Sequence, residues 1–212
     1  VDIVNPLADQ GGGVGLSSLR PDRLNDRFCA ALKRAGYRTL TTASDGASQR
    51  LRDLLDRRAK ENHLLRVAEL ARAHAFDRLK LYMMVGVPGE TDEDIDELIA
   101  FGREVSRLVP LSLGIAPFVA KRNTPLDGLP FAGIKTVDRR LDRLRRGVKG
   151  RVDLRATSAR WAWVEWVLAQ GGPAEGRAVM DAVHAGGHFR AWKNAFDALP
   201  ESRPRRPLAI VA

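Results

Sequence analysis

The feature that most constrains the fold is a regular alternation of short apolar runs with longer helical patterns. Four runs have the composition of strands, and they cover residues 13–19, 38–43, 79–86 and 111–118. Helical spacing of apolar side chains occupies residues 22–35, 48–75, 91–108 and 136–147. We expect the second of these patterns to break into two helices near residues 60–62. Strands separated by helices predict βα units and a parallel sheet, and nearly continuous apolar strands indicate a sheet covered on both faces.

From residue 157 onward the pattern predicts helices only, over residues 158–169, 174–185 and 188–199. We therefore expect three parts: an α/β part over residues 1–150, a helical extension over 151–200 and a basic, flexible tail over 201–212. Trp161, Trp163 and Trp166 in the extension are interpreted as packing residues. Four βα units make half of an eightfold barrel, so the α/β part is either an open sheet or the later part of a barrel. We favour the barrel.

The composition excludes several classes of protein. A chain that is 44% hydrophobic and 29% charged is globular rather than disordered. No apolar run approaches the roughly 18 residues of a membrane span, and no signal peptide is evident. The single cysteine, Cys29, excludes an internal disulfide framework and favours a reducing cytoplasm. It also excludes a cysteine-ligated metal site built from this chain alone.

The net charge of +9 has two interpretations, a nucleic-acid or other anionic partner and a solvated arginine-rich surface. The basic residues lie mainly in helical patterns at residues 50–60 and 139–151 and in the tail at 203–206. No RNA-binding aromatic signature lies between them. We favour the solvated surface.

Polar or glycine-rich segments follow each predicted strand. They are S-S-L-R at 17–20, T-T-A-S-D-G-A-S-Q-R at 41–50, G-V-P-G-E-T at 86–91 and P-F-V-A-K-R-N-T-P at 117–125. Each alone is ordinary, because glycines form turns and Thr91 reads as a helix N-cap. Ligands of parallel α/β proteins bind at the carboxyl ends of the strands, so four such segments on one edge predict a pocket.

The side chains in these segments suit a zwitterionic, hydroxylated small molecule. Arg20 or Arg50 could pair with a carboxylate. Hydroxyl groups could be bound by Ser17, Ser18, Thr41 and Asp45, and Gly86 and Gly89 would let the backbone approach a flat heterocycle. No catalytic triad, phosphate loop or dinucleotide fingerprint is present, and we assign no catalytic residue and no metal ligand.

The four strand-end segments resemble those of one enzyme family. The stretch LKLYMMVGVPGETDEDIDELI resembles the fifth-strand segment of radical S-adenosylmethionine (SAM) enzymes, where a G-x-P-G-E turn lies beside the adenine. VGLSSLRPDRL is similar to the third-strand segment, RTLTTASDGASQRLRD to the fourth, and LSLGIAPFVAKRNTPLDGLPF to the sixth. The chain is most similar to a subgroup that often carries a cobalamin-binding domain before the barrel. In that subgroup an R-W-x-x-x-E helix follows the barrel, and Arg160, Trp161 and Glu165 match this pattern here.

This resemblance implies a partial (β/α) TIM-type barrel, of which the chain holds strands three to six of six, followed by a small helical C-terminal extension. It implies that SAM is bound by Ser17, Ser18, Arg20, Thr41, Asp45, Arg50, Met84, Gly86, Pro88, Gly89, Ala116, Pro117 and Phe118. By this resemblance, the residues at 17–20, together with Asp45 and Arg50, would face the ribose or the amino-acid end of SAM. The backbone at residues 84–86 and 116–118 would flank the adenine. Asp45 stands where relatives often have glutamate.

The departure from the family concerns its C-x-x-x-C-x-x-C motif, which holds a [4Fe-4S] cluster that reductively cleaves SAM to a 5′-deoxyadenosyl radical. Cys29 is solitary and falls within a helical pattern. The chain begins at Val1 without a methionine, and we expect it to be the C-terminal part of a longer enzyme whose first two strands and cluster loop lie upstream. This part alone would be inactive. The alternative is a degenerate member that has lost its chemistry.

Two other classes of function stay open. A similar G-F-P-G-E turn in radical methylthiotransferases that modify tRNA, together with the net charge, suggests RNA modification. The tryptophan-bearing extension suggests a non-catalytic interaction module. The expected partners are SAM and the remainder of the same polypeptide, and the sequence predicts neither the substrate, nor the reaction, nor the use of cobalamin.

Overall fold

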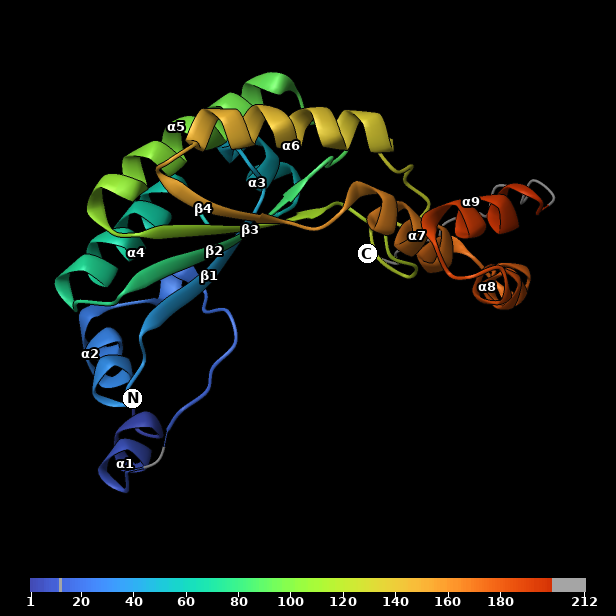
Figure 1. The fold of residues 1–212 in the computed structure, drawn as a ribbon. Coiled ribbons are helices and arrows are strands. Elements are labelled where there is room, and N and C mark those ends of the chain that lie inside the picture. Colours follow the sequence, from blue (N-terminus) through green and yellow to red (C-terminus); the bar gives the residue numbers. More distant parts are fainter. Residues whose placement is uncertain (12, 200–212) are drawn as a thin grey trace. The chain divides into compact units, whose positions relative to one another are not determined.

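The chain divides into two compact units in a computed structural model that describes residues 1–11 and 13–199 (Figure 1). The first unit comprises residues 1–85, 89–116 and 140–156, and the second comprises residues 86–88, 117–139 and 157–199 of the described chain. Both units are therefore discontinuous in sequence, and the unit that contains the sheet ends at residue 156. The predicted basic tail over 201–212 lies outside the described residues.

The first unit is built on a parallel sheet with the strand order β1-β2-β3-β4. Its strands are β1 (Thr39–Asp45), β2 (Arg78–Val85), β3 (Leu111–Pro117) and β4 (Val152–Ala156). Its helices are α1 (Val4–Asp9), η1 (Pro21–Arg23), α2 (Asp26–Arg34), α3 (Gln49–Leu54), α4 (Glu61–Ala73) and α5 (Asp92–Leu108), with the later turns of α6 (Ile134–Val148). The α/β class, the parallel sheet and the break between α3 and α4 are confirmed.

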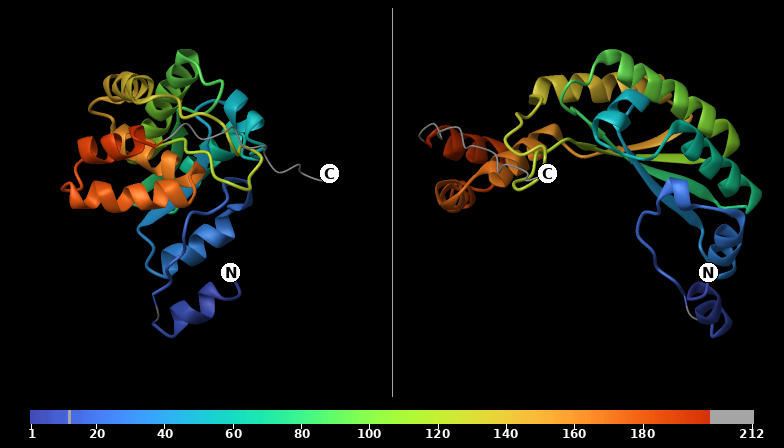
Figure 2. Two further views of the ribbon diagram at one scale, coloured as in Figure 1. Left: turned by 90° about the vertical axis from the view of Figure 1, so that its right-hand side faces the viewer. Right: turned by 180° about the vertical axis from the view of Figure 1, so that it is seen from behind.

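One face of the sheet carries the core of this unit. Alternate residues of the strands are buried there, among them Leu40, Leu81 and Leu113. They lie under α4 and α5, which cover this face in Figures 1 and 2 and bury their own apolar stripes. Fully burying a leucine is worth about 1.5 to 3 kcal/mol, so this layer holds the strands in register.

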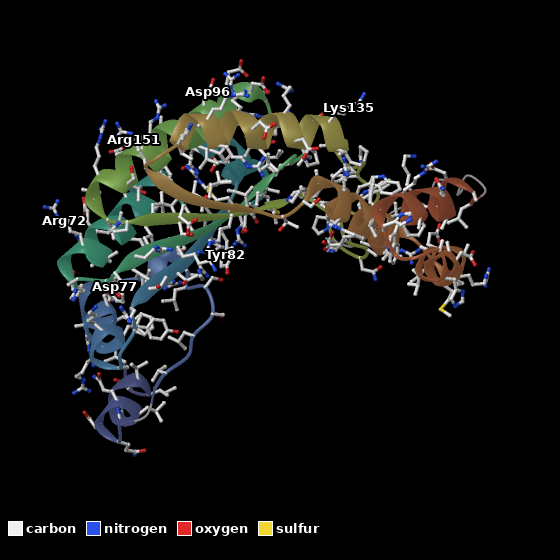
Figure 3. The ribbon with its side chains drawn as sticks, in the orientation of Figure 1. Arg72, Asp77, Tyr82, Asp96, Lys135 and Arg151 are labelled. Atoms are coloured by element: carbon white, nitrogen blue, oxygen red, sulfur yellow. The ribbon has the colours of Figure 1, made fainter. Side chains whose placement is uncertain are left out.

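The opposite face of the sheet is polar, and no helix of the described part of this unit covers it (Figures 1 and 2). We call it the open face, and it consists of Arg78, Lys80, Tyr82, Ser112, Gly114, Asp153 and Arg155. Tyr82 is 41% exposed, and Figure 3 shows it on the side of the sheet away from α4 and α5. The expectation of a sheet covered on both faces therefore does not hold within this unit.

Two strand assignments differ from the sequence-based expectation. Of the predicted first strand at residues 13–19, only Leu19 joins the sheet, through a single parallel bridge to Thr42. Gly13 and Gly15 have no neighbour within 4 Å of a hypothetical side chain, and the Leu16 backbone is bound by the Tyr37 hydroxyl rather than by a strand, so this segment does not extend the sheet. The strand β4 was not predicted, because its alternation of Val152 and Leu154 with charged residues is short and follows directly after a basic helix.

Side-chain caps explain where several helices begin. Asn25 accepts a hydrogen bond from the Phe28 N–H (2.9 Å) before α2, and Ser48 accepts one from the Leu51 N–H (3.2 Å) before α3. At the start of α5 the Thr91 N–H donates to Asp94 Oδ2 at 2.7 Å. Three acidic residues in this first turn also complement the helix dipole.

The second unit contains α7 (Ala159–Gln170), α8 (Pro173–His184) and α9 (Phe189–Asp197), together with the first turns of α6. Its core forms around Val164, Ala178 and Phe196, with Trp163 and Trp192 packed against them. Trp163 meets the ring of Phe196 edge to face at 5.9 Å. The interpretation of these tryptophans as packing residues is confirmed for Trp163, and Trp161 keeps 46% of its surface exposed.

The R-W-x-x-x-E helix anchors the loop that follows β3. Glu165 forms an ion pair with Lys121, and Trp166 donates its indole N–H to the Leu129 carbonyl at 3.0 Å. Gln170 donates to the Ala120 carbonyl at 2.8 Å. Among the residues that the structure describes, no helix has both the length and the apolar character required to cross a bilayer.

Candidate functional site

The segment at residues 17–20 lies alongside the end of β1. The Leu19 N–H donates to the Thr41 carbonyl at 2.8 Å, and Thr42 Oγ1 donates to the Leu19 carbonyl at 2.6 Å. These two bonds bring Ser17 and Ser18, both exposed, next to the strand. The structure thus brings the predicted residues Ser17 and Ser18 close to Thr41 on β1.

A cavity of about 240 Å³ opens between this segment and the loop after α3. It is lined by Arg20, Pro21, Asp22, Ala43, Asp56, Arg57, Arg58 and Ala59. Asp22 accepts two hydrogen bonds from Arg20, at 3.0 and 2.6 Å, and the bond from Arg20 lowers the pKa of Asp22. Arg57 is paired with Asp45. Arg58 has no carboxylate partner within the described part of the chain, so it is the cation available to a bound anion.

Arg50, a predicted partner of the SAM carboxylate, is engaged elsewhere. Its guanidinium donates to Asp94 Oδ2 at 2.5 Å and to the Gly89 carbonyl at 2.9 Å. Asp94 also accepts a bond from Ser48 Oγ at 2.5 Å. Burial by itself would raise the pKa of Asp94, but the bonds from Ser48, the Thr91 N–H and Arg50 together lower it. Arg50 therefore joins α3 to the turn that precedes α5.

The turn at residues 86–91 needs glycine at two positions. Gly86 has φ of +79° and Gly89 has φ of +76°, in the left-handed region that favours glycine. At Gly86 an added side chain would also lie 3.1 Å from the Cβ of Ala132. At Gly89 nothing lies within 4 Å of such a side chain, so this stretch of backbone is accessible to a ligand.

A buried ion pair holds the end of this turn. Arg140 Nη1 donates to Glu90 Oε2 at 2.9 Å, and Nη2 donates to the Glu90 carbonyl. The side chains of Glu90 and Arg140 are 0% and 11% exposed. Together with the Arg50–Asp94 pair, this contact fixes both ends of the Gly89–Thr91 backbone against helices α3 and α6.

The remaining predicted residues lie at the ends of β2 and β3. Met84 is partly buried and Ala116 is exposed, and both are on the same face of the sheet as Lys80 and Tyr82. Gly86, Pro88, Pro117 and Phe118 belong to the second unit, where Pro117 and Phe118 are buried. The first unit thus holds nine of the predicted residues, of which Thr41 lies within β1, opposite Lys80, rather than at the carboxyl edge of the sheet: Ser17, Ser18, Arg20, Thr41, Asp45, Arg50, Met84, Gly89 and Ala116.

Sequence reasoning missed Arg57, Arg58 and Arg140. A weak signal exists for the first two, since the basic pair follows directly on the end of α3, where Asp56 has φ of +49°. Arg140 is one of many arginines in a basic helical pattern. Only the folded chain distinguishes it, because there its exposed fraction is 9%.

The residues present do not fit an iron–sulfur cluster. Over residues 1–11 and 13–199, no group of three or more His, Cys, Asp or Glu side chains is arranged to hold a metal ion. Cys29, the one cysteine of the sequence, is buried in α2, and burial raises the pKa of its thiol to about 11. A thiol in this state is not prepared to act as a thiolate ligand.

Comparison with known proteins bears on the same region. Residues 9–102 match the family model of the radical SAM superfamily. The radical SAM match includes the segment at residues 17–20, the whole of β1 and β2, the turn at 86–91 and most of α5. It therefore covers the residues that line the cavity and the Arg50–Asp94 pair, and it includes Glu90 but not its partner Arg140.

A curated relative extends beyond the radical SAM match. An uncharacterized protein of Methanocaldococcus jannaschii is 36% identical over 128 residues, which are 60% of this chain and 28% of the relative. The chain thus spans less than a third of the length of the curated relative that it matches. The name of this relative states no activity.

Proposed function

We propose that this chain contributes the SAM-binding part of a radical SAM enzyme. The observation that carries the proposal is the position of the family match: it includes the strand ends, the cavity that Arg58 lines and the exposed backbone at Gly89. The donor set suits SAM, which combines a carboxylate, an ammonium group, ribose hydroxyls and a flat adenine. Bound SAM would supply radical chemistry to the complete enzyme.

The chain's own residues would bind and orient the cofactor. Arg58, and Arg20 held by Asp22, offer donors to the carboxylate, while Ser17 and Ser18 offer hydroxyl groups. The exposed backbone at Gly89 offers its amide group to the adenine, together with the backbone at Met84 and Ala116, while the Gly89 carbonyl is bound by Arg50. Glu90, Asp94 and their arginine partners would keep that backbone in place.

The cluster and the first strands of the barrel would come from other parts of the complete protein, and a cobalamin-binding domain is a further candidate for them. Two observations support this division: the chain has one buried cysteine, and its curated relative is more than three times as long as the aligned segment. The single cysteine also keeps a reducing cytoplasm as our expected location. The substrate and the reaction stay open.

SAM binding tests the proposal directly. We would measure it on the complete protein by anaerobic equilibrium dialysis with radiolabelled SAM, for the wild type, Arg58→Ala and the control Arg151→Ala. Arg151 is an exposed arginine outside the cavity. We expect Arg58→Ala to weaken binding about tenfold, which is the effect of losing one charge-assisted bond of about 1.4 kcal/mol, and Arg151→Ala to leave it unchanged. Equal affinities for all three proteins, or no binding to the wild type, would contradict the proposal.

The 212-residue chain alone provides the complementary test. We expect it to acquire no [4Fe-4S] absorbance on anaerobic reconstitution and to release no 5′-deoxyadenosine from SAM. A brown, cluster-loaded chain would refute the division between this chain and the cluster loop.

RNA modification is the less favoured alternative. Much of the positive charge is neutralised locally, because helix arginines pair with neighbouring acids, as in Arg143–Asp96 at 2.6 Å, Arg145–Asp142 at 2.8 Å and Arg66–Asp26 at 2.9 Å. The basic residues at 203–206 lie outside the described part. Nucleic-acid binding would appear as an affinity that falls steeply with salt, and its absence at low salt would remove this alternative.

A further inference from the structure

Within the described residues of the first unit, the open face lacks the helices that ordinarily cover both faces of a parallel sheet. In parallel sheets both faces are normally buried under helices, which makes the strands apolar on both sides. Here α4 and α5 bury one face, whereas the other places charged and hydroxyl groups along β2, β3 and β4. A polar surface in this position suits a polar ligand better than a packed helix.

The charges of the open face are not balanced. Asp153 is its only acidic side chain, and it is shared by Arg78 at 3.1 Å, Arg155 at 3.1 Å and the hydroxyl of Ser112 at 3.2 Å. One carboxylate therefore serves two guanidinium groups. The face keeps an excess of positive charge even before Lys80 is counted.

Lys80 is the cation of this face without an acidic partner in the described chain. Its Nζ lies 4.7 Å from the centre of the Tyr82 ring, and its side chain is partly buried in the middle of β2. The Tyr82 ring is in turn supported by Gly114, since a side chain there would approach the ring to 2.8 Å. The aromatic ring thus holds the ammonium group in place, and the N–H donors of the ammonium group stay available for hydrogen bonds.

Lys80 is also placed in relation to the candidate SAM site. Thr41 pairs with Lys80 in the register of β1 and β2, so its hydroxyl lies beside the lysine on the same face. Met84, a candidate cofactor residue, is four residues further along β2 on that face. At a rise of about 3.3 Å per residue, Lys80 lies roughly 13 Å from the carboxyl edge.

We propose that Lys80, with Thr41 and Tyr82 beside it, binds an oxyanion group of the substrate, a carboxylate or a phosphate. That the ligand is the substrate of a SAM-dependent reaction rests on the proposed function. The distance along β2 selects an elongated molecule, which would place its reacting atom at the carboxyl edge while its anionic end lies deeper on the open face. Charge complementarity excludes a cationic substrate from this position.

The experiment uses the complete protein with inorganic phosphate and with succinate as probes of the two kinds of oxyanion. The readout is the backbone amide signal of Tyr82 in nitrogen-15 NMR spectra, assigned with a Tyr82→Phe variant. We expect saturable shifts with one or both probes and none with sodium chloride at equal ionic strength. The preferred probe identifies the oxyanion as phosphate or carboxylate.

Variants separate this site from general attraction to a basic protein. Lys80→Met is expected to weaken the binding of the preferred probe at least tenfold, Lys80→Arg to retain it, and the exposed control Lys149→Met to leave it unchanged. Equal titrations for Lys80→Met and the wild type, or shifts equal to those with chloride, would overturn the inference. If Lys80→Arg retains probe binding, the loss in Lys80→Met is caused by the missing cation and not by misfolding of a chain substituted at this position.

The same variants are tested for SAM binding, so that the two proposals can fail separately. Lys80→Met is expected to bind SAM as the wild type does, because Lys80 does not line the cavity that holds Arg20 and Arg58. Normal SAM binding with Lys80-independent anion binding would overturn only the inference drawn here. No SAM binding by the wild type would overturn the proposed function, whereas Lys80-dependent shifts would still support an oxyanion site.

Discussion

Removing Arg140 is expected to destabilise the first unit far more than removing an arginine elsewhere on the same helix. The side chain of Glu90 is fully buried, and Arg140 provides it with a 2.9 Å ion pair while also binding its backbone carbonyl. Arg140→Met leaves the carboxylate buried without this partner. Breaking a buried pair in this way costs about 3 to 5 kcal/mol, so we expect the free energy of unfolding to fall by that amount.

The matched control is Arg143→Met, one turn along α6. Arg143 pairs with Asp96 at 2.6 Å, but both side chains are about half exposed, so solvent screens the interaction. Surface pairs of this kind contribute about 0 to 1 kcal/mol. The contrast between the two arginines therefore isolates the effect of burial, at equal loss of charge and of side-chain length.

The assay is urea denaturation followed by circular dichroism, in the near-ultraviolet region for the tyrosines and in the far-ultraviolet region for the helices. Tyr37 and Tyr82, the two tyrosines of the chain, lie in the first unit with Arg140, whereas all four tryptophans lie in the second. A loss of about 3 to 5 kcal/mol corresponds to a fall in Tm of roughly 6 to 20 °C for a chain of this length.

A double variant tests the cause of the loss. Arg140→Met with Glu90→Met removes both charges, and we expect it to recover most of the stability that either single variant loses. The reasoning is refuted if Arg140→Met costs no more than Arg143→Met, or if the double variant is less stable than both single variants.

Three further predictions concern single groups. Asp94 has a lowered pKa in the folded chain, so its contribution to stability is present above about pH 4 and is lost as the pH falls through the folded pKa. When the free energy of unfolding is measured as a function of pH, Asp94→Asn should therefore lose less stability below about pH 4 than the wild type does. The pKa of Cys29 is raised to about 11, so stability should hold below pH 9 and fall by up to about 3 kcal/mol as the pH rises to 11. Cys29→Ala should lack that fall, and an equal fall in both proteins would contradict the burial of the thiol. Gly89→Ala should cost about 1 to 2 kcal/mol because φ is +76° there, measured by urea denaturation, and a neutral result would show that the turn relaxes at no cost.

Much of the first unit could be predicted from the sequence because its signals are local. The apolar runs at β1, β2 and β3, the cap at Thr91 and the break after α3 depend on neighbouring residues, and all appear in the structure. β4 and the segment at residues 13–19 were misassigned because short edge elements depend on what they pair with. A single bridge at Leu19 and a five-residue strand leave almost no periodicity to detect.

The candidate site shows the same division. The glycines of the turn and the arginine at position 20 could be found from their place after a strand, since parallel strands bring their carboxyl ends to one edge. The partners of the charged residues could not. Arg50 was predicted to be available to a ligand, and the structure pairs it with Asp94, 44 residues away; Arg58 was overlooked, and it lines the cavity.

The sequence by itself determined the order of strands and helices, the glycine-dependent turn and the resemblance of these segments to the radical SAM superfamily, whose family model matches residues 9–102. Only the tertiary structure decided which of many arginines are buried, paired or free, and which face of the sheet stays polar. The physical reason is that secondary structure follows from contacts within a few residues, whereas the state of a charge depends on burial and on partners that are distant in the chain. Glu90 and Arg140, 50 residues apart, become a buried pair only when α6 lies against the turn.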